Sequence, residues 1–244
     1  MILPRGWQMK LKGNLLLTLL ELARLGGLEQ GIKVAEKELG KRLGLAQQTI
    51  SAHLIALERQ GYVSRLRTGK RSDIVVNEVA LGELSHMLFM LVKALGIESL
   101  EIRMRGAVMT GIREGGYYMA LEGYRRQFQA KLGMVPYPGT LNLSLLTKRD
   151  VLKKLLLFTL PGIRIGEWND GVRSYGGLTC YPVVVRFGNR EEEAFLCNID
   201  RTHYQAQIAE LIAERNLREA LAAKDGDVID VIAKLDRSIL DKAS

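Results

Sequence analysis

The hydrophobic pattern of this 244-residue chain changes near Leu100, and the change divides the sequence into two parts. Before Leu100, apolar residues recur every three or four positions, which is the spacing of amphipathic helices. After it, short runs typical of strands replace the helical pattern. Because the chain is long enough for two cores, we expect a multi-domain protein with one domain over residues 1–98 and a second over residues 99–244.

Three helices are expected in the first part. The first follows the apolar stripe of residues 15–23 and is closed by the glycines at 26–27. A second is expected over residues 34–43, and a third starts near Ala46, with Gly44 in the short turn between them. A glycine-containing turn of about three residues between two helices is typical of the helix-turn-helix motif.

A basic hairpin is expected after the third helix. Residues 62–67 form one strand, residues 68–71 a tight turn and residues 73–77 the returning strand. Residues 1–98 carry 14 Lys and Arg against 9 Asp and Glu, which suits binding to phosphates. We therefore predict a winged helix-turn-helix domain that binds duplex DNA.

Residues 37–51 resemble prokaryotic winged helix-turn-helix regulators, and that resemblance places the start of the recognition helix after Ala46. The residues expected to contact DNA are Gln47, Gln48, Thr49, Ser51 and His53 in this helix and Arg65, Arg67, Lys70 and Arg71 in the hairpin. The alternative is a helical protein-interaction module with a solvated basic hairpin. A further helix over residues 78–95 would link the domains or pair with a second subunit, so we expect a homodimer.

The second part is expected to fold as a small β-barrel with helices at its margin. Its strand-like runs are residues 100–108, 183–187, 194–197 and 228–233. The two cysteines, Cys180 and Cys197, lack the spacing of a zinc site and are expected to be buried free thiols. No apolar run is long enough to span a membrane, so we expect a cytoplasmic protein.

Two motifs in this part indicate phosphate chemistry. Residues 111–118, GIREGGYY, follow a strand and contain three glycines, which let backbone N–H groups approach phosphate oxygens closely, although ordinary turns look similar. Residues 136–142, PYPGTLN, form a rigid turn after which Thr140 and Asn142 point to one face of a strand. Two neutral oxygens on one face suit Mg²⁺ bound to a nucleotide, but they equally suit backbone groups.

These motifs and the later segments at 201–204 and 215–219 occur in the order found in CTP-dependent riboflavin kinases of archaea. The chain resembles this family over residues 101–235, and a winged-helix domain before the kinase resembles the fused regulator-kinases of archaea. The resemblance implies a cradle-loop, riboflavin-kinase-like barrel. It also implies transfer of the γ-phosphoryl group of CTP to riboflavin, which yields FMN and CDP and uses one Mg²⁺ ion.

The family's site residues transfer to positions in this chain. The nucleotide contacts fall on Gly111, Ile112, Arg113, Glu114, Gly115, Gly116, Arg215, Asn216, Leu217 and Arg218. The magnesium ligands fall on Thr140 and Asn142, and the flavin contacts on Thr202 and Glu210. Glu210 is the candidate to accept the hydroxyl proton. Arg113 departs from the glycine usual in the family, so the resemblance leaves its effect on nucleotide affinity open.

Two alternative functions stay open, and Glu210 and residues 224–227 each have a purely structural interpretation. The protein could be a transcription factor whose barrel only senses a flavin or nucleotide, or a kinase whose helical domain only mediates assembly. Without the resemblance, Glu210 would be taken for an exposed helical glutamate. Residues 224–227 are expected to form a hairpin turn before the last strand, with no part in the chemistry.

Overall fold

The computed structural model describes residues 10–11, 13–68, 71–111, 115–200 and 206–236. The chain divides into two compact units on either side of residues 96 and 97. Every helix in the described residues is too short or too polar to cross a bilayer.

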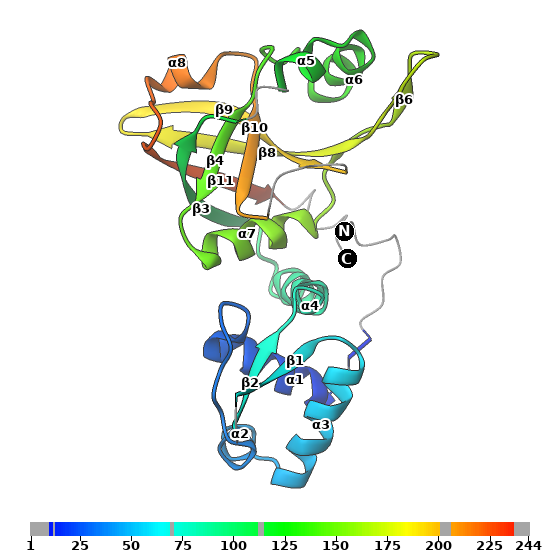
Figure 1. Ribbon diagram of the computed structural model, residues 1–244, viewed down its shortest axis with the longest axis vertical. Helices are drawn as coiled ribbons and strands as arrows, with labels where there is room; N and C mark the ends of the chain where they lie inside the picture. The colour runs from blue at the N-terminus through cyan, green and yellow to red at the C-terminus, as the bar shows by residue number, and fades with distance from the viewer. Residues whose placement is uncertain (1–9, 12, 69–70, 112–114, 201–205, 237–244) are drawn as a thin grey trace. The chain divides into compact units, whose positions relative to one another are not determined.

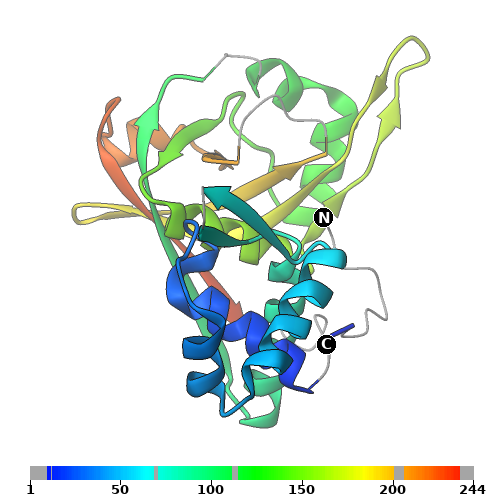
Figure 2. The ribbon, with the colours of Figure 1, turned by 60° about the horizontal axis from the view of Figure 1, so that its bottom comes forward.

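The first unit consists of helices followed by a two-stranded hairpin and a last helix (Figure 1). Its elements are α1 (Gly13–Leu22), a π-helical turn η1 (Ala23–Gly27), α2 (Glu36–Leu43), α3 (Gln47–Arg59), β1 (Val63–Thr68), β2 (Arg71–Val76) and α4 (Ala80–Ala94). Figure 2 shows α1, α2 and α3 grouped together. The helices and the hairpin expected from the sequence are therefore present.

Glycines end the helices where the sequence predicts. Gly44 adopts a left-handed conformation, with φ of 67°, and terminates α2. Gly40 allows a close approach, because a Cβ atom there would lie 2.6 Å from the carbonyl oxygen of Leu45. The turn into α3 is therefore tight, and Ile50 and Leu54 of α3 are buried in the core of this unit.

The second unit contains most of the strands. Its elements are β3 (Ser99–Met109), α5 (Gly115–Ala120), α6 (Glu122–Leu132), β4 (Leu141–Leu145), α7 (Lys148–Phe158), β5 (Ile163–Ile165), β6 (Trp168–Asn169), β7 (Ser174–Tyr175), β8 (Leu178–Phe187), β9 (Arg190–Ile199), β10 (Ile208–Ile212), α8 (Leu217–Leu221) and β11 (Val228–Asp236). In Figure 1, α5 and α6 lie on one side of these strands and α7 on the other.

Within the described residues, six strands close into a barrel in the order β11, β3, β4, β10, β9 and β8. Pairing of β8 with β11 completes the ring, and β5 adds to β8 outside it. This confirms the expected small β-barrel with marginal helices. Strand β10 was not predicted, because its five residues alternate too briefly to be distinguished from a helical segment.

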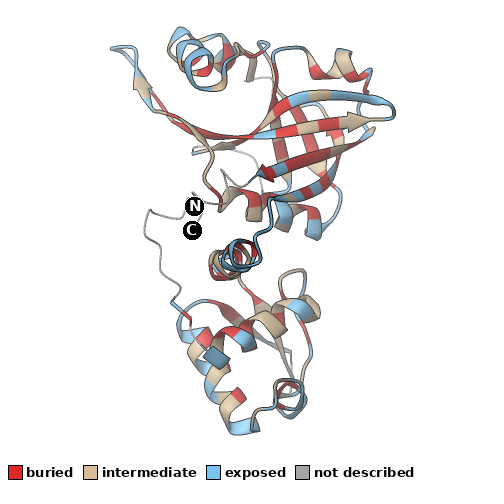
Figure 3. Ribbon diagram, turned by 180° about the vertical axis from the view of Figure 1, so that it is seen from behind, coloured by how far each residue is buried: buried red, intermediate tan, exposed pale blue. Residues whose placement is uncertain are grey.

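Buried residues line the barrel strands, as the red segments in Figure 3 show. A second buried cluster lies under α6 and includes Tyr124, Phe128 and Leu178. Cys180 and Cys197 belong to this cluster, pair directly across β8 and β9, and are both free thiols, which confirms that expectation.

Candidate active site

A cavity of about 730 Å³ lies in the barrel unit, within the size range of small-molecule sites. It brings together several segments that are far apart in the sequence. Its lining includes residues 109–111, 115–116, 137–142, 173–178 and 215–218, together with Tyr118, Met119, Tyr124, Ile199, Glu210, Leu211 and Ala213. The expected nucleotide segments, the PYPGTLN turn and Glu210 therefore share one cavity, as far as the structure describes them.

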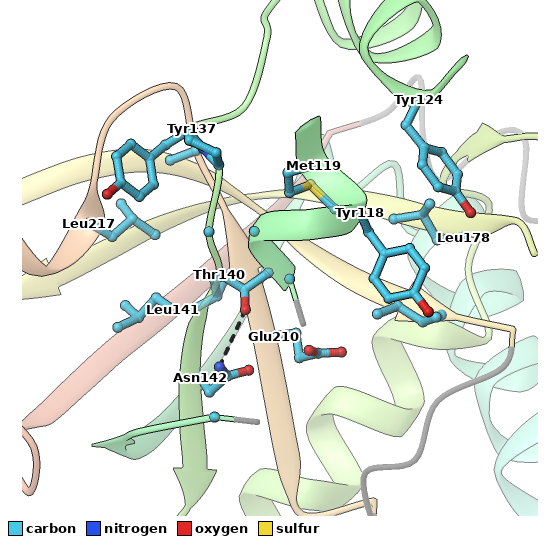
Figure 4. A pocket seen from close by; sticks show the side chains of 18 of the residues that line it. Tyr118, Met119, Tyr124, Tyr137, Thr140, Leu141, Asn142, Leu178, Glu210 and Leu217 are labelled. Atoms are coloured by element: carbon cyan, nitrogen blue, oxygen red, sulfur yellow. Dashed lines mark hydrogen bonds between the residues drawn. The ribbon is translucent and has the colours of Figure 1, made fainter. Parts of the chain in front are cut away.

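Strand register places Asn142 and Glu210 beside each other. Asn142 on β4 lies directly opposite Glu210 on β10, and directly opposed residues point to the same face of a sheet. Figure 4 shows the Glu210 carboxyl group between Asn142 and Tyr118. Glu210 is therefore not an exposed helical residue, as its local sequence alone suggested, but a partly buried strand residue.

The Asn142 side chain has an oxygen available for a ligand. It is only 6% exposed, and its Nδ2 donates a hydrogen bond of 3.3 Å to Thr140 Oγ1. Its Oδ1 is buried without a partner among the described residues, an arrangement that is costly unless a ligand or water satisfies it. The expected pair Thr140 and Asn142 is thus brought together with one unsatisfied oxygen.

A metal at this position would need ligands from outside the protein. In the described part of the chain, no group of three or more His, Cys, Asp or Glu side chains is arranged to hold a metal ion. The two neutral oxygens of Thr140 and Asn142 fit a hard cation only if phosphate oxygens and water complete its shell. The donor set therefore fits Mg²⁺ carried in with a nucleotide.

Burial raises the pKa of Glu210 to about 7, and the positive charge of Lys154 acts in the opposite direction. Lys154 is itself buried in α7 and donates a hydrogen bond of 2.7 Å to the carbonyl oxygen of Ile208. On the other side of Glu210 lies Cys197, a thiol whose pKa is raised by its contact with Cys180 and by burial. A carboxyl group with a pKa near neutrality can exchange a proton during a reaction.

The glycines of the first motif allow close packing. A Cβ atom on Gly115 would lie 2.8 Å from Thr140 Oγ1, and one on Gly116 would lie 3.0 Å from the carbonyl oxygen of Pro138. Gly115 and Gly116 do not adopt the left-handed backbone conformation, because neither has a positive φ. Close approach, rather than an unusual backbone conformation, therefore explains the glycines here. Ile112, Arg113 and Glu114 lie outside the described residues.

Residues 215–218, expected from the sequence to contact a nucleotide, also line the cavity. Asn216 caps α8 by accepting a hydrogen bond from the Arg218 backbone, and Leu217 is buried. Arg215 pairs with Glu192 at 2.9 Å. Arg218 donates to the carbonyl oxygen of Met109 at 2.8 Å and pairs with Asp225 at 2.6 Å. The sequence analysis assigned no role to Asp225.

The other end of the cavity is aromatic and apolar and is not predictable from the sequence. Tyr118 and Leu178 lie on the far side of Glu210 from Tyr137 and Leu217 (Figure 4), and Met119 also lines the cavity. The β6–β7 hairpin adds Arg173, Ser174 and Tyr175 to the lining. Tyr118 ends the GIREGGYY motif, but no local pattern distinguishes the other residues from ordinary core positions, so only the fold groups them. Thr202, the expected flavin contact, lies outside the described residues.

The residues expected to contact DNA belong to the first unit. Gln47 and Gln48 are exposed at the start of α3, and Thr49 and Ser51 are partly exposed. His53 instead forms a hydrogen bond of 2.8 Å through Nδ1 to Thr18 Oγ1 on α1, which turns this ring edge toward the unit's interior.

Arg65 is partly buried, and its Nε lies 3.4 Å from the Glu58 carboxylate of α3, while its Nε and Nη2 have no hydrogen-bond partner among the described residues. The side chains of Arg67 and Arg71, and the whole of Lys70, lie outside the described residues. The hairpin backbone pairs from Val63 with Val76 to Thr68 with Arg71, and residues 69–70 lie outside the described residues.

Comparison with known proteins connects this site to an enzyme family. The family model CTP-dep_RFKase, described as "Domain of unknown function DUF120", matches residues 108–232. The riboflavin kinase of Methanosarcina barkeri is 36% identical over 223 residues, which cover 88% of this chain and 93% of that protein. The riboflavin kinase of Pyrobaculum islandicum is 37% identical over 190 residues, covering 75% and 87%. That of Picrophilus torridus is 32% identical over 224 residues, covering 91% and 98%.

Proposed function

The chain belongs to the CTP-dependent riboflavin kinase family, and we propose that it forms FMN and CDP by transferring the γ-phosphoryl group of CTP to the 5′-hydroxyl of riboflavin. The proposal rests on the pair Asn142 and Glu210, which lie opposite each other on adjacent strands and line the same cavity. Tyr137 and Leu217, beside the polar residues Arg215, Asn216 and Arg218, lie on one side of this pair, and Tyr118 and Leu178 lie on the other. A nucleotide and a flavin ring match these two ends in chemistry.

Thr140 and Asn142 would hold Mg²⁺ together with the phosphates of CTP. The unpartnered Asn142 Oδ1 supports this assignment, since a buried oxygen without a partner is a suitable ligand for a hard cation. When bound, Mg²⁺ would neutralise charge on the phosphate oxygens. Gly115 and Gly116 keep the start of α5 close to the PYPGTLN turn, so backbone groups there can line the phosphates.

Glu210 is proposed to accept the proton of the riboflavin 5′-hydroxyl. As that oxygen forms its bond to the γ-phosphorus, the bond between this phosphorus and the bridging oxygen of CDP breaks, and CDP leaves. A pKa of about 7 supports the role, because the carboxylate is available near neutral pH and the acid it becomes is not strongly disfavoured. The aromatic end would stack the flavin ring and so orient the hydroxyl toward Glu210.

The test compares CTP with ATP as phosphate donors for FMN formation, each with and without Mg²⁺. We expect Mg²⁺-dependent activity with CTP preferred. Asn142→Ala should lower turnover at limiting Mg²⁺ by about 10- to 100-fold, because a ligand oxygen is lost. Asn142→Asp, which keeps oxygen ligands, serves as the matched variant and should retain more activity.

Equal use of ATP would remove the CTP preference from the proposal. Wild-type turnover of Asn142→Ala at limiting Mg²⁺, with an intact fold by circular dichroism, would remove Asn142 from the metal site. Binding of flavin and nucleotide without FMN formation under any of these conditions would favour the alternative in which the barrel only senses its ligands.

We further propose that the first unit is a winged helix-turn-helix domain that binds duplex DNA and regulates genes of flavin synthesis or transport. The order of α2, a tight turn, α3 and a hairpin supports this proposal, as do the exposed Gln47 and Gln48 at the start of α3. The engaged His53 and Arg65 are less suited to DNA contacts than the sequence alone suggested. An assembly-only role for this unit is the competing hypothesis.

A further inference from the structure

Asp225 joins two segments of the proposed nucleotide site that are more than 100 residues apart in the chain. Its Oδ2 accepts a hydrogen bond of 2.6 Å from Thr110 Oγ1, beside Gly111 where the glycine-rich loop begins. Its Oδ1 lies 2.6 Å from Arg218 Nη1, in the second nucleotide segment. Both Thr110 and Arg218 line the cavity, whereas Asp225 lies behind them and is not part of the lining.

Arg218 is held at two points by these contacts. Its Nη2 donates to the carbonyl oxygen of Met109 at 2.8 Å, while its Nη1 faces Asp225. A guanidinium group held at two points has lost much of its rotational freedom before a ligand arrives. The hydrogen bond from Thr110 and the contact with Arg218 lower the pKa of Asp225, so the carboxylate stays charged at neutral pH.

The turn that carries Asp225 closes without this side chain. The backbone N–H of Lys224 donates to Asp227 Oδ2 at 2.7 Å, and the N–H of Asp227 donates to the carbonyl oxygen of Lys224 at 3.0 Å. Gly226 supplies the left-handed conformation, with φ of 92°. The same turn is tied to β3 by two backbone hydrogen bonds with Val108. The Asp225 carboxylate is therefore free to serve another purpose.

We propose that Asp225 is a positioning residue for the nucleotide, which fixes Arg218 and Thr110 relative to each other so that both ends of the phosphate site are formed before CTP binds. This inference rests on the proposed function. Asp225 touches neither the substrate nor the reacting atoms, so its loss should weaken nucleotide binding and leave the chemical step at saturating CTP almost unchanged.

The experiment uses the full-length protein and the Asp225→Asn variant, which keeps the size of the side chain but removes its charge. We expect the dissociation constant of Mg·CDP, measured by titration calorimetry, and the KM for CTP to rise about 10-fold. The turnover number should change by less than about 2-fold. Thermal stability should not fall, because partly exposed ion pairs contribute little to it.

Glu101→Gln is the matched control. It removes an exposed ion pair with Arg103, at 3.0 Å, near the start of β3 and away from its Met109 end. Nucleotide affinity and turnover should both stay at wild-type values in this variant.

A double-mutant cycle separates positioning through Arg218 from a structural effect. In an Arg218→Ala background, Asp225→Asn should have only a small further effect on Mg·CDP affinity, because the group that it positions is gone. Fully additive effects would overturn the proposal, as would wild-type or tighter Mg·CDP binding by Asp225→Asn. If the wild-type protein does not phosphorylate riboflavin with CTP, the proposed function fails instead. An active wild type with an unaffected Asp225→Asn rejects only this inference.

Discussion

Glu210 owes its properties to its neighbours on three elements. Asn142 on β4 and Cys197 on β9 flank it across the sheet without adding charge near neutral pH, and Lys154 on α7 supplies the opposing positive charge. Burial is the largest effect and raises the pKa of Glu210 to about 7 from an ordinary value of 4.5. A single residue thus combines the location and the proton affinity that the proposed role needs.

Glu210→Gln should reduce the rate of the chemical step by about 100-fold in single-turnover kinetics, because an amide accepts a proton poorly. Affinity for Mg·CDP should change little. The wild-type rate should rise with pH through about 7, as the carboxyl group ionises. The rate of the variant should not show this rise with pH. Glu214→Gln, an exposed glutamate just after β10, is the control. A wild-type single-turnover rate in Glu210→Gln would exclude the proton-accepting role.

The raised pKa of Glu210 also predicts a pH-dependent stability. The carboxyl group prefers the protonated form in the folded state, so its favourable contribution is present below pH 4.5 and is lost as pH rises through about 7. In urea unfolding, the free energy of unfolding of Glu210→Gln should therefore rise relative to that of the wild type between pH 5 and pH 8, by on the order of 2 kcal/mol. An identical pH dependence of the two proteins would contradict the raised pKa.

At the scale of elements, the β6–β7 hairpin depends on a close approach to α6. Trp168 stacks on Tyr175, with ring centroids 4.4 Å apart and an interplanar angle of 11°, and meets Tyr124 of α6 edge-on at 5.6 Å. A Cβ atom on Gly123 would lie 2.3 Å from Trp168 Cδ2, so only glycine leaves room for the indole. The hairpin carries cavity-lining residues, so this contact affects the aromatic end of the site.

Gly123→Ala should displace Trp168, lower the free energy of unfolding by about 1–3 kcal/mol and raise the KM for riboflavin more than the KM for CTP. Gly166→Ala is the control, because its Cβ would meet only the Gln127 side chain, at 3.4 Å. Steady-state kinetics with each substrate varied in turn, together with urea unfolding, measures both effects. Equal increases in the two KM values would show that the hairpin does not act on the riboflavin end alone.

At the scale of the whole molecule, the chain combines two compact units with different proposed partners. The formal net charge of +8 suits anionic partners in general. A nucleotide is proposed for the barrel unit and DNA for the helical unit. Each proposal can fail without the other, because the residues that support them lie in separate units.

The full-length protein should bind duplex DNA with an affinity that falls steeply as salt rises, because basic side chains displace condensed counterions. Neutralising Arg67, Lys70 and Arg71 together should flatten the salt slope by about one unit for each phosphate that is no longer neutralised.

Gln48→Ala should instead change the preferred sequence, since Gln48 is exposed at the start of α3. Selection from random duplexes, with and without FMN and CTP, measures this preference. Recovery of no enriched motif would exclude the regulator and leave the kinase standing.

Features with local causes could be predicted from the sequence. Helical periodicity and the glycines at 44 and 61 predicted α2, α3 and their ends, because a left-handed residue terminates a helix whatever surrounds it. The PYPGTLN turn correctly placed Thr140 and Asn142 on one face, since side chains alternate along a strand. The family resemblance led to Glu210, which its local sequence did not single out.

Which of these residues meet depends on the packing of the whole barrel. Asn142 and Glu210 are neighbours because β4 and β10 pair in one register, and register depends on closure of the barrel rather than on either strand alone. The aromatic end of the cavity and the contacts of Asp225 arise in the same way, from segments brought together over long sequence separations. Periodicity and turn chemistry are local properties of a chain, whereas a binding cavity is a property of its packing.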